Sequence, residues 1–344
     1  MRAGVIRGKG QFALAEVAEP APGEGQAVVD IQRCGICGSD VHAYVEGWAY
    51  APGICGHEWM GVVRAVAPGV TVVGEGDRVV GSGVAPGCGA CEECRADLPE
   101  YCSTARAAYA GRRAPANGGF ARSMALDANR LCRIPAAVSD EQGAIVEPSS
   151  VALHGVRKSR LRMGDVACVV GCGPIGLLTI QCALIAGAGH VIAVEPDAAR
   201  RERALRMGAH AAFAPGAELR EHLNELTGSL RADIAFDCAG VPQTLQQSVD
   251  LVRRGGSVCM IGVSNGDATV APMRWVGKEV SIDTSMVFTL EEMGIAAGLV
   301  ADGRLRVGEL HDATITLDEL GATIDDLANR RLDAVKVLVD PTAG

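Results

Sequence analysis

Hydrophobic and polar positions follow two different patterns along the 344 residues of the chain. Up to about residue 148, short apolar runs such as 27–32 and 61–66 are separated by Gly- and Pro-rich stretches, which is typical of short strands joined by turns. From about residue 165, apolar runs such as 166–171 alternate with stretches of helical spacing such as 197–209. This alternation predicts a parallel sheet with helices on both of its faces.

After about residue 285 the chain has a helical stretch at 289–305 and a strand-like run at 333–341. The most apolar segment, residues 175–194, is about long enough to span a membrane, but it contains Gln181, His190 and a Gly-Ala-Gly break. We expect a buried helix followed by a buried strand there, and no membrane span. The chain length favours two domains.

Composition narrows the classes of function. The formal net charge of −9 disfavours nucleic acid as a partner, because phosphate binding needs a basic face. The first residues lack the basic flank and apolar run of a signal peptide, so a reducing, cytoplasmic location is expected. In such a compartment, the thirteen cysteines are better interpreted as thiols and metal ligands than as disulfide bridges.

The stretch VVGCGPIG contains Gly171, Gly173 and Gly176 between a predicted strand and a predicted helix. This G-x-G-x-x-G spacing is the fingerprint of a dinucleotide-binding loop. In such a loop, Gly171 allows the tight turn, Gly173 lets the backbone approach a pyrophosphate, and Gly176 lets helix and strand pack closely. The alternative is a glycine-rich turn that binds no ligand.

Glu195 ends the next predicted strand, 19 residues after Gly176. An acidic side chain at this place accepts hydrogen bonds from both adenosine ribose hydroxyls and repels a 2′-phosphate, which favours NAD over NADP. Arg200, Arg201 and Arg203 follow closely and could soften that preference. For Arg201 and Arg203, a solvated helix face is the simpler interpretation.

Four cysteines, Cys88, Cys91, Cys94 and Cys102, are spaced C-x2-C-x2-C-x7-C. Four thiolates in a short loop make a closed tetrahedral site, which is typical of structural zinc. A disulfide pair is disfavoured by the expected compartment, and an iron–sulfur cluster by the spacing. A zinc ribbon that contacts nucleic acid is disfavoured by the net charge and by the acidic residues within the loop.

A second set of candidate metal ligands comes from Cys37, His57 and Glu147. Three protein ligands with one open position make a catalytic zinc site. Taken singly, Cys37 is equally explained as a core thiol, His57 as a buried histidine, Glu58 as a surface charge and Glu147 as a carboxylate at a helix start. Spacing alone does not decide between these interpretations.

Together, these motifs resemble those of the zinc-containing medium-chain dehydrogenases, the alcohol and polyol dehydrogenase superfamily, and the resemblance runs over essentially the whole chain. The motifs that carry it are CGICGSDVH at 34–42, GHE at 56–58, the four-cysteine loop, EPSSVALHG at 147–155 and GCGPIG at 171–176. Two glutamates make the chain similar to the sorbitol, threonine and butanediol dehydrogenase branch. They are Glu58, which follows the histidine of GHE, and Glu147, which begins EPSSVALHG.

The resemblance implies that Cys37 and His57 are fixed ligands of a catalytic zinc, while Glu58 and Glu147 share the remaining positions with water. Asp40 would orient His57. The four-cysteine loop would hold a second, structural zinc.

The resemblance also implies a proton relay through Ser39 and His42, so the implied catalytic residues are Cys37, Ser39, His42, His57 and Glu147. Arg200 would contact the adenosine ribose, Lys336 the pyrophosphate, and the backbone of 283–288 the nicotinamide amide. The implied cofactor-binding residues are Gly171, Gly173, Pro174, Ile175, Gly176, Glu195, Arg200 and Lys336.

The implied fold class is α/β, with a doubly wound parallel-sheet (Rossmann) domain at 150–285. It is inserted into a discontinuous, mainly β (GroES-like) catalytic domain formed by 1–149 and 286–344. Relatives of this kind form homodimers or homotetramers, so a homo-oligomer is expected.

The implied function is the reversible oxidation of a secondary alcohol, diol or polyol by NAD, with zinc as Lewis acid. The alternatives are a zinc-free enone or quinone reductase of the same fold and a non-catalytic NAD-binding protein. Sorbitol dehydrogenases usually have a tyrosine after the relay histidine, whereas this chain has Ala43, with Tyr44, Trp48 and Trp59 nearby. This difference makes sorbitol doubtful and favours a bulkier or more apolar secondary alcohol.

Overall fold

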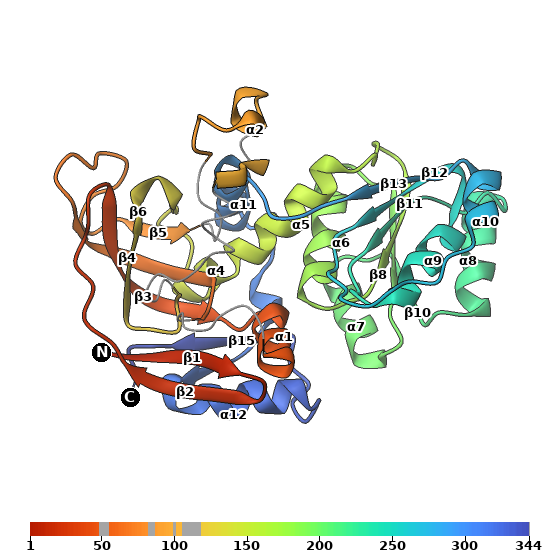
Figure 1. The fold of residues 1–344 in the computed structure, drawn as a ribbon. Coiled ribbons are helices and arrows are strands. Elements are labelled where there is room, and N and C mark those ends of the chain that lie inside the picture. The colour runs from red at the N-terminus through yellow and green to blue at the C-terminus, as the bar shows by residue number, and fades with distance from the viewer. Residues whose placement is uncertain (48–54, 82–86, 99–100, 105–117, 344) are drawn as a thin grey trace. The chain divides into compact units, whose positions relative to one another are not determined.

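The computed structural model describes residues 1–47, 55–81, 87–98, 101–104 and 118–343 (Figure 1). These residues form two compact units. Unit 1 comprises Met1–Glu147, Thr289–Asp302 and Leu310–Gly344, and unit 2 comprises Pro148–Phe288 and Gly303–Glu309. The first border lies two residues before the expected residue 149, and the second lies three residues after the expected residue 285. The domain borders themselves stay a prediction.

Unit 1 is built around a seven-stranded sheet and a β-hairpin. In the sheet, β14 (His311–Thr316), β15 (Lys336–Asp340), β3 (Gln26–Gly35), β4 (Glu58–Val66), β5 (Arg78–Gly81) and β7 (Leu131–Arg133) follow one another, and β6 (Ser123–Asp127) pairs with β3. The hairpin joins β1 (Arg2–Gly8) and β2 (Gln11–Glu16). The predicted strand run 27–32 lies within β3, and the alternate residues Ala27, Val29 and Ile31 enter the hydrophobic core from one face.

Short helices complete unit 1. They are α1 (Gly38–Glu46), α2 (Glu92–Arg95), η2 (Ala128–Arg130), α4 (Asp140–Ala144), α11 (Leu290–Ala301) and α12 (Leu317–Ala328). Helix α5 (Val146–Lys158) begins in unit 1 and continues in unit 2, and η3 (Gly308–Leu310) lies at the border near residue 309.

Unit 2 contains a parallel six-stranded sheet. Its order is β10 (Ala211–Phe213), β9 (His190–Val194), β8 (Val166–Val170), β11 (Ala232–Asp237), β12 (Val252–Met260) and β13 (Ser281–Thr284). The helices that connect or follow these strands are α6 (Pro174–Ile185), α7 (Ala198–Arg206), α8 (Ala217–Thr227), α9 (Pro242–Leu251) and α10 (Pro272–Lys278). Numbered from β8 in chain order, the sheet reads 3-2-1-4-5-6, which is the doubly wound order, so the predicted fold class is confirmed.

This strand order places a topological switch between β8 and β11. Ligands of doubly wound sheets bind outside the carboxyl ends of the strands at this switch. The apolar segment 175–194 forms α6 and β9, as expected, and among the described residues no helix is long and apolar enough to cross a membrane.

Candidate functional site

The pairing of β3 with β4 brings the two metal-ligand motifs of unit 1 together. Gly35 lies opposite Glu58 in the antiparallel ladder, so Cys37, two residues after Gly35, comes close to His57 and Glu58. A Cβ at position 35 would lie 2.3 Å from a carboxylate oxygen of Glu58, which explains the glycine there. The Cys37 Sγ, one ring nitrogen of His57 and one carboxylate oxygen of Glu58 all lie within 4.8 Å of one another.

Cys37 is the N-cap residue of α1. Its Sγ accepts a hydrogen bond from the Ser39 amide at 3.5 Å, and its own amide donates to Asp40 Oδ2 at 2.9 Å. A helix N-terminus favours a negatively charged group. The local fold thus places the Cys37 sulfur at the N-terminus of α1, beside the Ser39 amide.

Asp40 is completely buried behind this cluster. Its Oδ1 lies 4.0 Å from His57 Nδ1 and has no hydrogen-bond partner among the described residues. Burial raises the pKa of Asp40, and the nearby His57 opposes that shift. The position agrees with the predicted role of Asp40 in orienting His57, which stays a prediction.

Lys336 lies in the same buried cluster. Its Nζ donates hydrogen bonds to Glu58 and to the backbone oxygen of Ile36, and the side chain is 1% exposed. The sequence predicted a pyrophosphate contact for Lys336, and that contact stays a prediction. The pair with Glu58 was missed because the two residues are 278 positions apart and no local pattern links them.

Glu147 completes the set of buried acids, although it is not among the three donors within 4.8 Å. Burial raises its pKa to about 7, and the charges of Glu58 and Asp40 act in the same direction, against His57 and Lys336. The cluster thus contains three buried carboxyl groups and a thiol but only one ammonium group and one imidazole. A divalent cation would neutralise the excess of negative charge. Thiolate, imidazole and carboxylate are the donors that zinc takes, so the residues fit zinc.

Ser39 and His42, the predicted relay residues, lie three positions apart on α1, which places them on neighbouring turns of one helix face. His42 is exposed and Ser39 half-buried. The expectation of a bulkier or more apolar substrate, which rested on Ala43 and the aromatic residues near it, gains no support from the structure. Ala43 is completely buried in the core, and Trp59 is 4% exposed there.

The hydroxyl of Tyr44, the next of these residues, donates to Asp325 at 3.0 Å and so ties α1 to α12. Trp48 lies outside the described residues. The motif fixed the order of these side chains but not the direction in which each one points.

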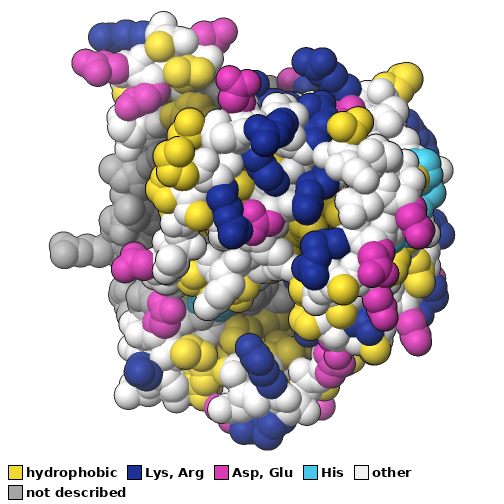
Figure 2. Space-filling model, turned by 90° about the vertical axis from the view of Figure 1, so that its right-hand side faces the viewer, with side chains coloured by type: hydrophobic (Ala, Val, Ile, Leu, Met, Phe, Trp, Pro, Cys, Tyr) yellow, Lys and Arg dark blue, Asp and Glu magenta, His cyan; other side chains and the backbone are white. Residues whose placement is uncertain are grey.

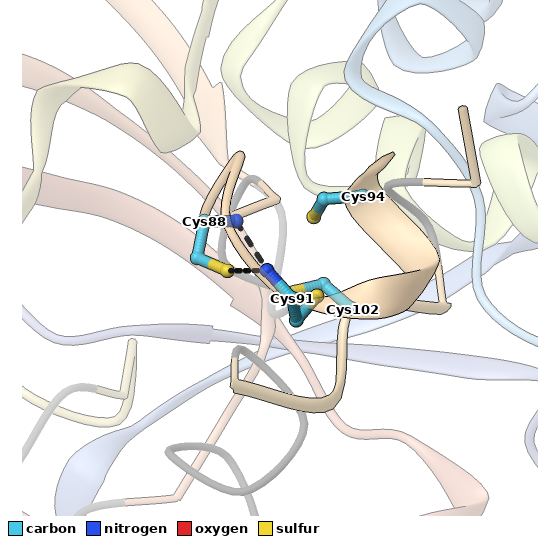
Figure 3. Close-up of side chains that lie close together, drawn as sticks. All are labelled: Cys88, Cys91, Cys94 and Cys102. Carbon is cyan, nitrogen blue, oxygen red and sulfur yellow. Dashed lines mark hydrogen bonds between the residues drawn. The ribbon is translucent and has the colours of Figure 1, made fainter. Parts of the chain in front are cut away.

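The four-cysteine loop gathers its sulfur atoms as predicted (Figure 3). The Sγ atoms of Cys88, Cys91, Cys94 and Cys102 lie within 4.8 Å of one another. None of the thirteen cysteines, all of which the structure describes, forms a disulfide, so the disulfide alternative has no support. The Cys88 sulfur accepts hydrogen bonds from the amides of Ala90 and Cys91 at 3.4 and 3.3 Å.

A hydrogen bond from the Thr104 side chain, aided by these two amides, lowers the pKa of Cys88 to about 6. Such donors stabilise thiolate sulfur. Four converging thiols with one acidic member fit a closed zinc site that has no open position.

The glycine loop of unit 2 has the geometry that its spacing predicted. Gly171 has a φ of 90°, in the left-handed region, and its Cβ would lie 2.7 Å from the Cα of Ala239. A Cβ on Gly176 would lie 1.8 Å from the Gly171 oxygen, so the close approach of helix and strand requires glycine. By contrast, a Cβ on Gly173 would have no atom within 4 Å, so open space lies at the N-terminus of α6. Such a cradle fits the pyrophosphate of a dinucleotide.

Glu195 follows β9 and is 7% exposed. Its carboxylate accepts hydrogen bonds from the amides of Cys172, at 2.8 Å, and Asp197, at 3.1 Å, and is therefore held against the glycine loop. Arg200 is half-buried in the first turn of α7.

Arg201 departs from the expected solvated face. Its guanidinium donates to the backbone oxygens of Glu195 and Pro196 at 2.9 and 2.6 Å. It therefore fixes the turn that presents Glu195.

Comparison with known proteins gives two family matches and full-length relatives. Residues 23–136 match the alcohol dehydrogenase GroES-like domain, and residues 174–302 match the zinc-binding dehydrogenase family. A 2-dehydro-3-deoxy-L-galactonate 5-dehydrogenase of Pseudoalteromonas atlantica is 30% identical over 341 residues, which cover 98% of this chain and 97% of that protein. An (R,R)-butanediol dehydrogenase of Bacillus subtilis is 32% identical over 347 residues, with coverage of 95% and 96%.

Solved structures agree with these matches. A zinc-binding dehydrogenase from Sinorhizobium meliloti bound to NADP has a TM-score of 0.88 and 31% identity, with 99% of each chain covered. A 2R,3R-butanediol dehydrogenase from Bacillus subtilis has a TM-score of 0.86 and 30% identity, also with 99% of each chain covered.

Proposed function

The chain belongs to the zinc-binding alcohol dehydrogenase family, and from this premise we propose that it oxidises a secondary alcohol bearing a neighbouring hydroxyl group, with NAD as the hydride acceptor. At the coarser level it is an oxidoreductase that interconverts alcohols and carbonyl compounds with zinc and a nicotinamide cofactor. The observation that carries the proposal is the convergence of Cys37, His57 and Glu58 within 4.8 Å.

We assign a catalytic zinc to Cys37 and His57, with Glu58 and Glu147 as carboxylate ligands, and a structural zinc to the four-cysteine loop. Zinc in the first site supplies Lewis acidity toward an alcohol oxygen, which lowers the pKa of the alcohol. Asp40 would orient the His57 ring, because its Oδ1, which has no hydrogen-bond partner among the described residues, lies 4.0 Å from Nδ1.

The proton released from the alcohol leaves through residues of α1 in this proposal. The Ser39 hydroxyl would accept it and release its own proton toward His42, and the exposed His42 imidazole would take up a proton and deliver it to solvent. Both residues lie on α1, whose N-cap is Cys37, so a single helix positions a ligand and the proton route.

NAD is the proposed cofactor because the Glu195 carboxylate stands beside the glycine loop. Two backbone amides hold it there, so it cannot easily turn away from a 2′-phosphate. We expect kcat/KM for NAD to exceed that for NADP by at least roughly tenfold, which is about 1.4 kcal/mol. Glu195→Gln should narrow the ratio, and equal or NADP-favouring values in the unaltered enzyme would remove this part of the proposal.

The substrate class rests on the relatives. One is named for a 5-dehydrogenase reaction on a deoxy sugar acid and another for (R,R)-butanediol, and both compounds carry a secondary alcohol on a short polar chain. No observation favours the zinc-free reductase or the non-catalytic protein.

A panel of diols, polyols and sugar acids, assayed for NAD reduction by the zinc-loaded enzyme, tests the proposal. Activity on at least one vicinal diol or sugar acid, lost in Cys37→Ser, is the expected result. Oxidation of simple secondary alcohols only, or activity that survives Cys37→Ser, would refute it.

We further propose that the chain forms a homodimer or homotetramer. Support comes from unit 2, where β13 is an edge strand of the described sheet and α10 exposes Met273 and Val276, at 79% and 69%. Figure 2 shows hydrophobic side chains exposed among Lys and Arg on the face that it presents. Light scattering on Met273→Glu and Val276→Glu tests this, and a monomeric unaltered protein would refute it.

A further inference from the structure

A buried carboxyl group without a place in the reaction lies at the carboxyl end of β11. Asp237 is the last residue of this strand and is 4% exposed. In the parallel sheet it lies opposite Val170, the residue directly before Gly171. Asp237 therefore stands at the topological switch point, beside the glycine loop.

The Asp237 carboxyl group holds the turn that follows it. Its Oδ1 accepts a hydrogen bond from the Ala239 amide at 3.2 Å. Both of its oxygens lie 2.9 Å from the Thr244 Oγ1, which also lies 2.7 Å from the Val241 oxygen. Thr244 is in the first turn of α9, so the carboxyl group links β11, the turn and the helix.

The number of protons available to these hydrogen bonds indicates whether the Asp237 carboxyl group is ionised or neutral. A threonine hydroxyl has one proton and cannot donate to the carboxylate and to the Val241 oxygen at once. If Asp237 is a neutral acid, its O–H donates to Thr244 Oγ1 and the threonine donates to Val241, while Oδ1 still accepts from Ala239. Two of the three short contacts of Thr244 Oγ1 are then hydrogen bonds, and the third joins it to the other oxygen of the same carboxyl group, whereas an ionised carboxylate would leave Oγ1 beside three acceptor oxygens with a single proton. Burial raises the pKa of Asp237, and the hydrogen bonds with Thr244 and the Ala239 amide oppose that shift.

The turn that Asp237 holds is packed directly against the glycine loop. A Cβ on Gly171 would lie 2.7 Å from the Ala239 Cα. On the other side, a Cβ on Gly240 would lie 2.6 Å from the Val263 oxygen, and one on Gly262 would lie 2.5 Å from the Gly240 nitrogen. The backbone of 239–240 thus fills the space between the glycine loop and the end of β12, and a shift of this turn would displace Gly171.

We propose that Asp237, as a neutral acid paired with Thr244, is a positioning residue that sets the 238–240 turn against Gly171 and thereby determines the affinity for the nicotinamide cofactor. This inference rests on the proposed use of the glycine loop for NAD. Asp237 itself acts through the turn and not on the reacting atoms.

The test measures NADH binding to the full-length, zinc-loaded enzyme by fluorescence titration, together with KM for NAD and kcat. Asp237→Asn should keep the dissociation constant within about twofold, because its amide donates to Thr244 and its carbonyl accepts from Ala239. Asp237→Ala and Thr244→Val should raise the dissociation constant and KM about tenfold or more, with kcat at saturating NAD unchanged. Thr244→Ser, which keeps the hydroxyl, should restore the affinity.

Asp233→Asn is the matched control, because Asp233 is a hydrogen-bonded carboxylate at the amino end of the same strand. It should leave cofactor affinity unchanged even where it lowers the melting temperature. If Asp237→Ala does not fold, the Thr244→Val and Thr244→Ser pair decides.

Three results would overturn the inference. They are a loss of affinity in Asp237→Asn equal to that in Asp237→Ala, an unchanged affinity in Thr244→Val, and an equal loss in Asp233→Asn. An unaltered enzyme that binds no dinucleotide would instead refute the proposed function.

Discussion

Substitution of Gly173 by alanine separates the cofactor role of the glycine loop from its structural role. Gly173 has a φ of −73°, which alanine adopts without strain, and no atom lies within 4 Å of the position that its Cβ would take. The free energy of unfolding should therefore stay the same or rise by about 0.4–1 kcal/mol. The added methyl group would occupy the open space in which we place the pyrophosphate.

The expected loss of cofactor binding follows from that position. A methyl group that keeps the pyrophosphate from the loop amides removes at least one hydrogen bond to a charged group, worth about 1.5–3 kcal/mol. This corresponds to a roughly 10- to 150-fold higher dissociation constant for NADH. Gly176→Ala should behave differently, since its Cβ would lie 1.8 Å from the Gly171 oxygen and the loop must move. We expect a loss of about 1–3 kcal/mol in stability as well as weaker binding.

Melting curves and NADH fluorescence titrations on the same preparations measure both quantities. Gly298→Ala in α11 is the control, because Gly298 also has no atom within 4 Å of its Cβ position but belongs to unit 1. It should gain about 0.5–1 kcal/mol and bind NADH normally. Normal NADH binding by Gly173→Ala would show that the open space does not receive the cofactor, and the reasoning would fail.

Three other predictions concern unit 1. Cys91→Ser should lower the zinc content by about one ion per chain and lower the melting temperature. Cys37→Ser, which keeps a good N-cap for α1, should abolish alcohol oxidation with little change in stability or NAD binding. Metal analysis and melting curves check both variants, and full stability of Cys91→Ser contradicts the assignment. His42→Ala should slow turnover mainly at lower pH, by about 100-fold or less, and an unchanged pH–rate profile would return His42 to a surface role. Lys336→Met leaves the Glu58 carboxylate buried without its ammonium partner and should cost about 3–5 kcal/mol in denaturant unfolding, and a cost below 1 kcal/mol would contradict the importance of the pair.

Local patterns predicted the elements and the glycine loop well. The apolar runs 27–32 and 166–171 correspond to β3 and β8. Gly171 and Gly176 make the close contacts that their spacing implied, and the Cβ position of Gly173 is in open space. These features depend on neighbouring residues, so a single sequence contains them. The four-cysteine loop belongs to the same class, since its ligands come from one short segment.

Features that depend on distant pairing were not predicted. The ammonium group of Lys336 reaches Glu58 only because β15 pairs with β3 and β3 with β4, which no short pattern specifies. Likewise, Ala43 and Trp59, on which the expectation about the substrate rested, are buried in the core, because a motif gives residue order and not side-chain direction. Asp237 carries no spacing signal at all, and its role becomes visible only through Thr244 and the packing against Gly171.

The three-part construction of unit 1 has a consequence for protein synthesis. Strand β15, which completes the pairing with β3 and delivers Lys336, is translated 278 residues after Glu58, which at ribosomal rates is a delay of roughly 14 to 56 seconds. During that interval the main stretch of unit 2, Pro148–Phe288, leaves the ribosome complete. The nascent chain therefore has a full dinucleotide domain while Glu58 still lacks its counter-charge, and a metal ion bound early would have to hold that carboxylate alone.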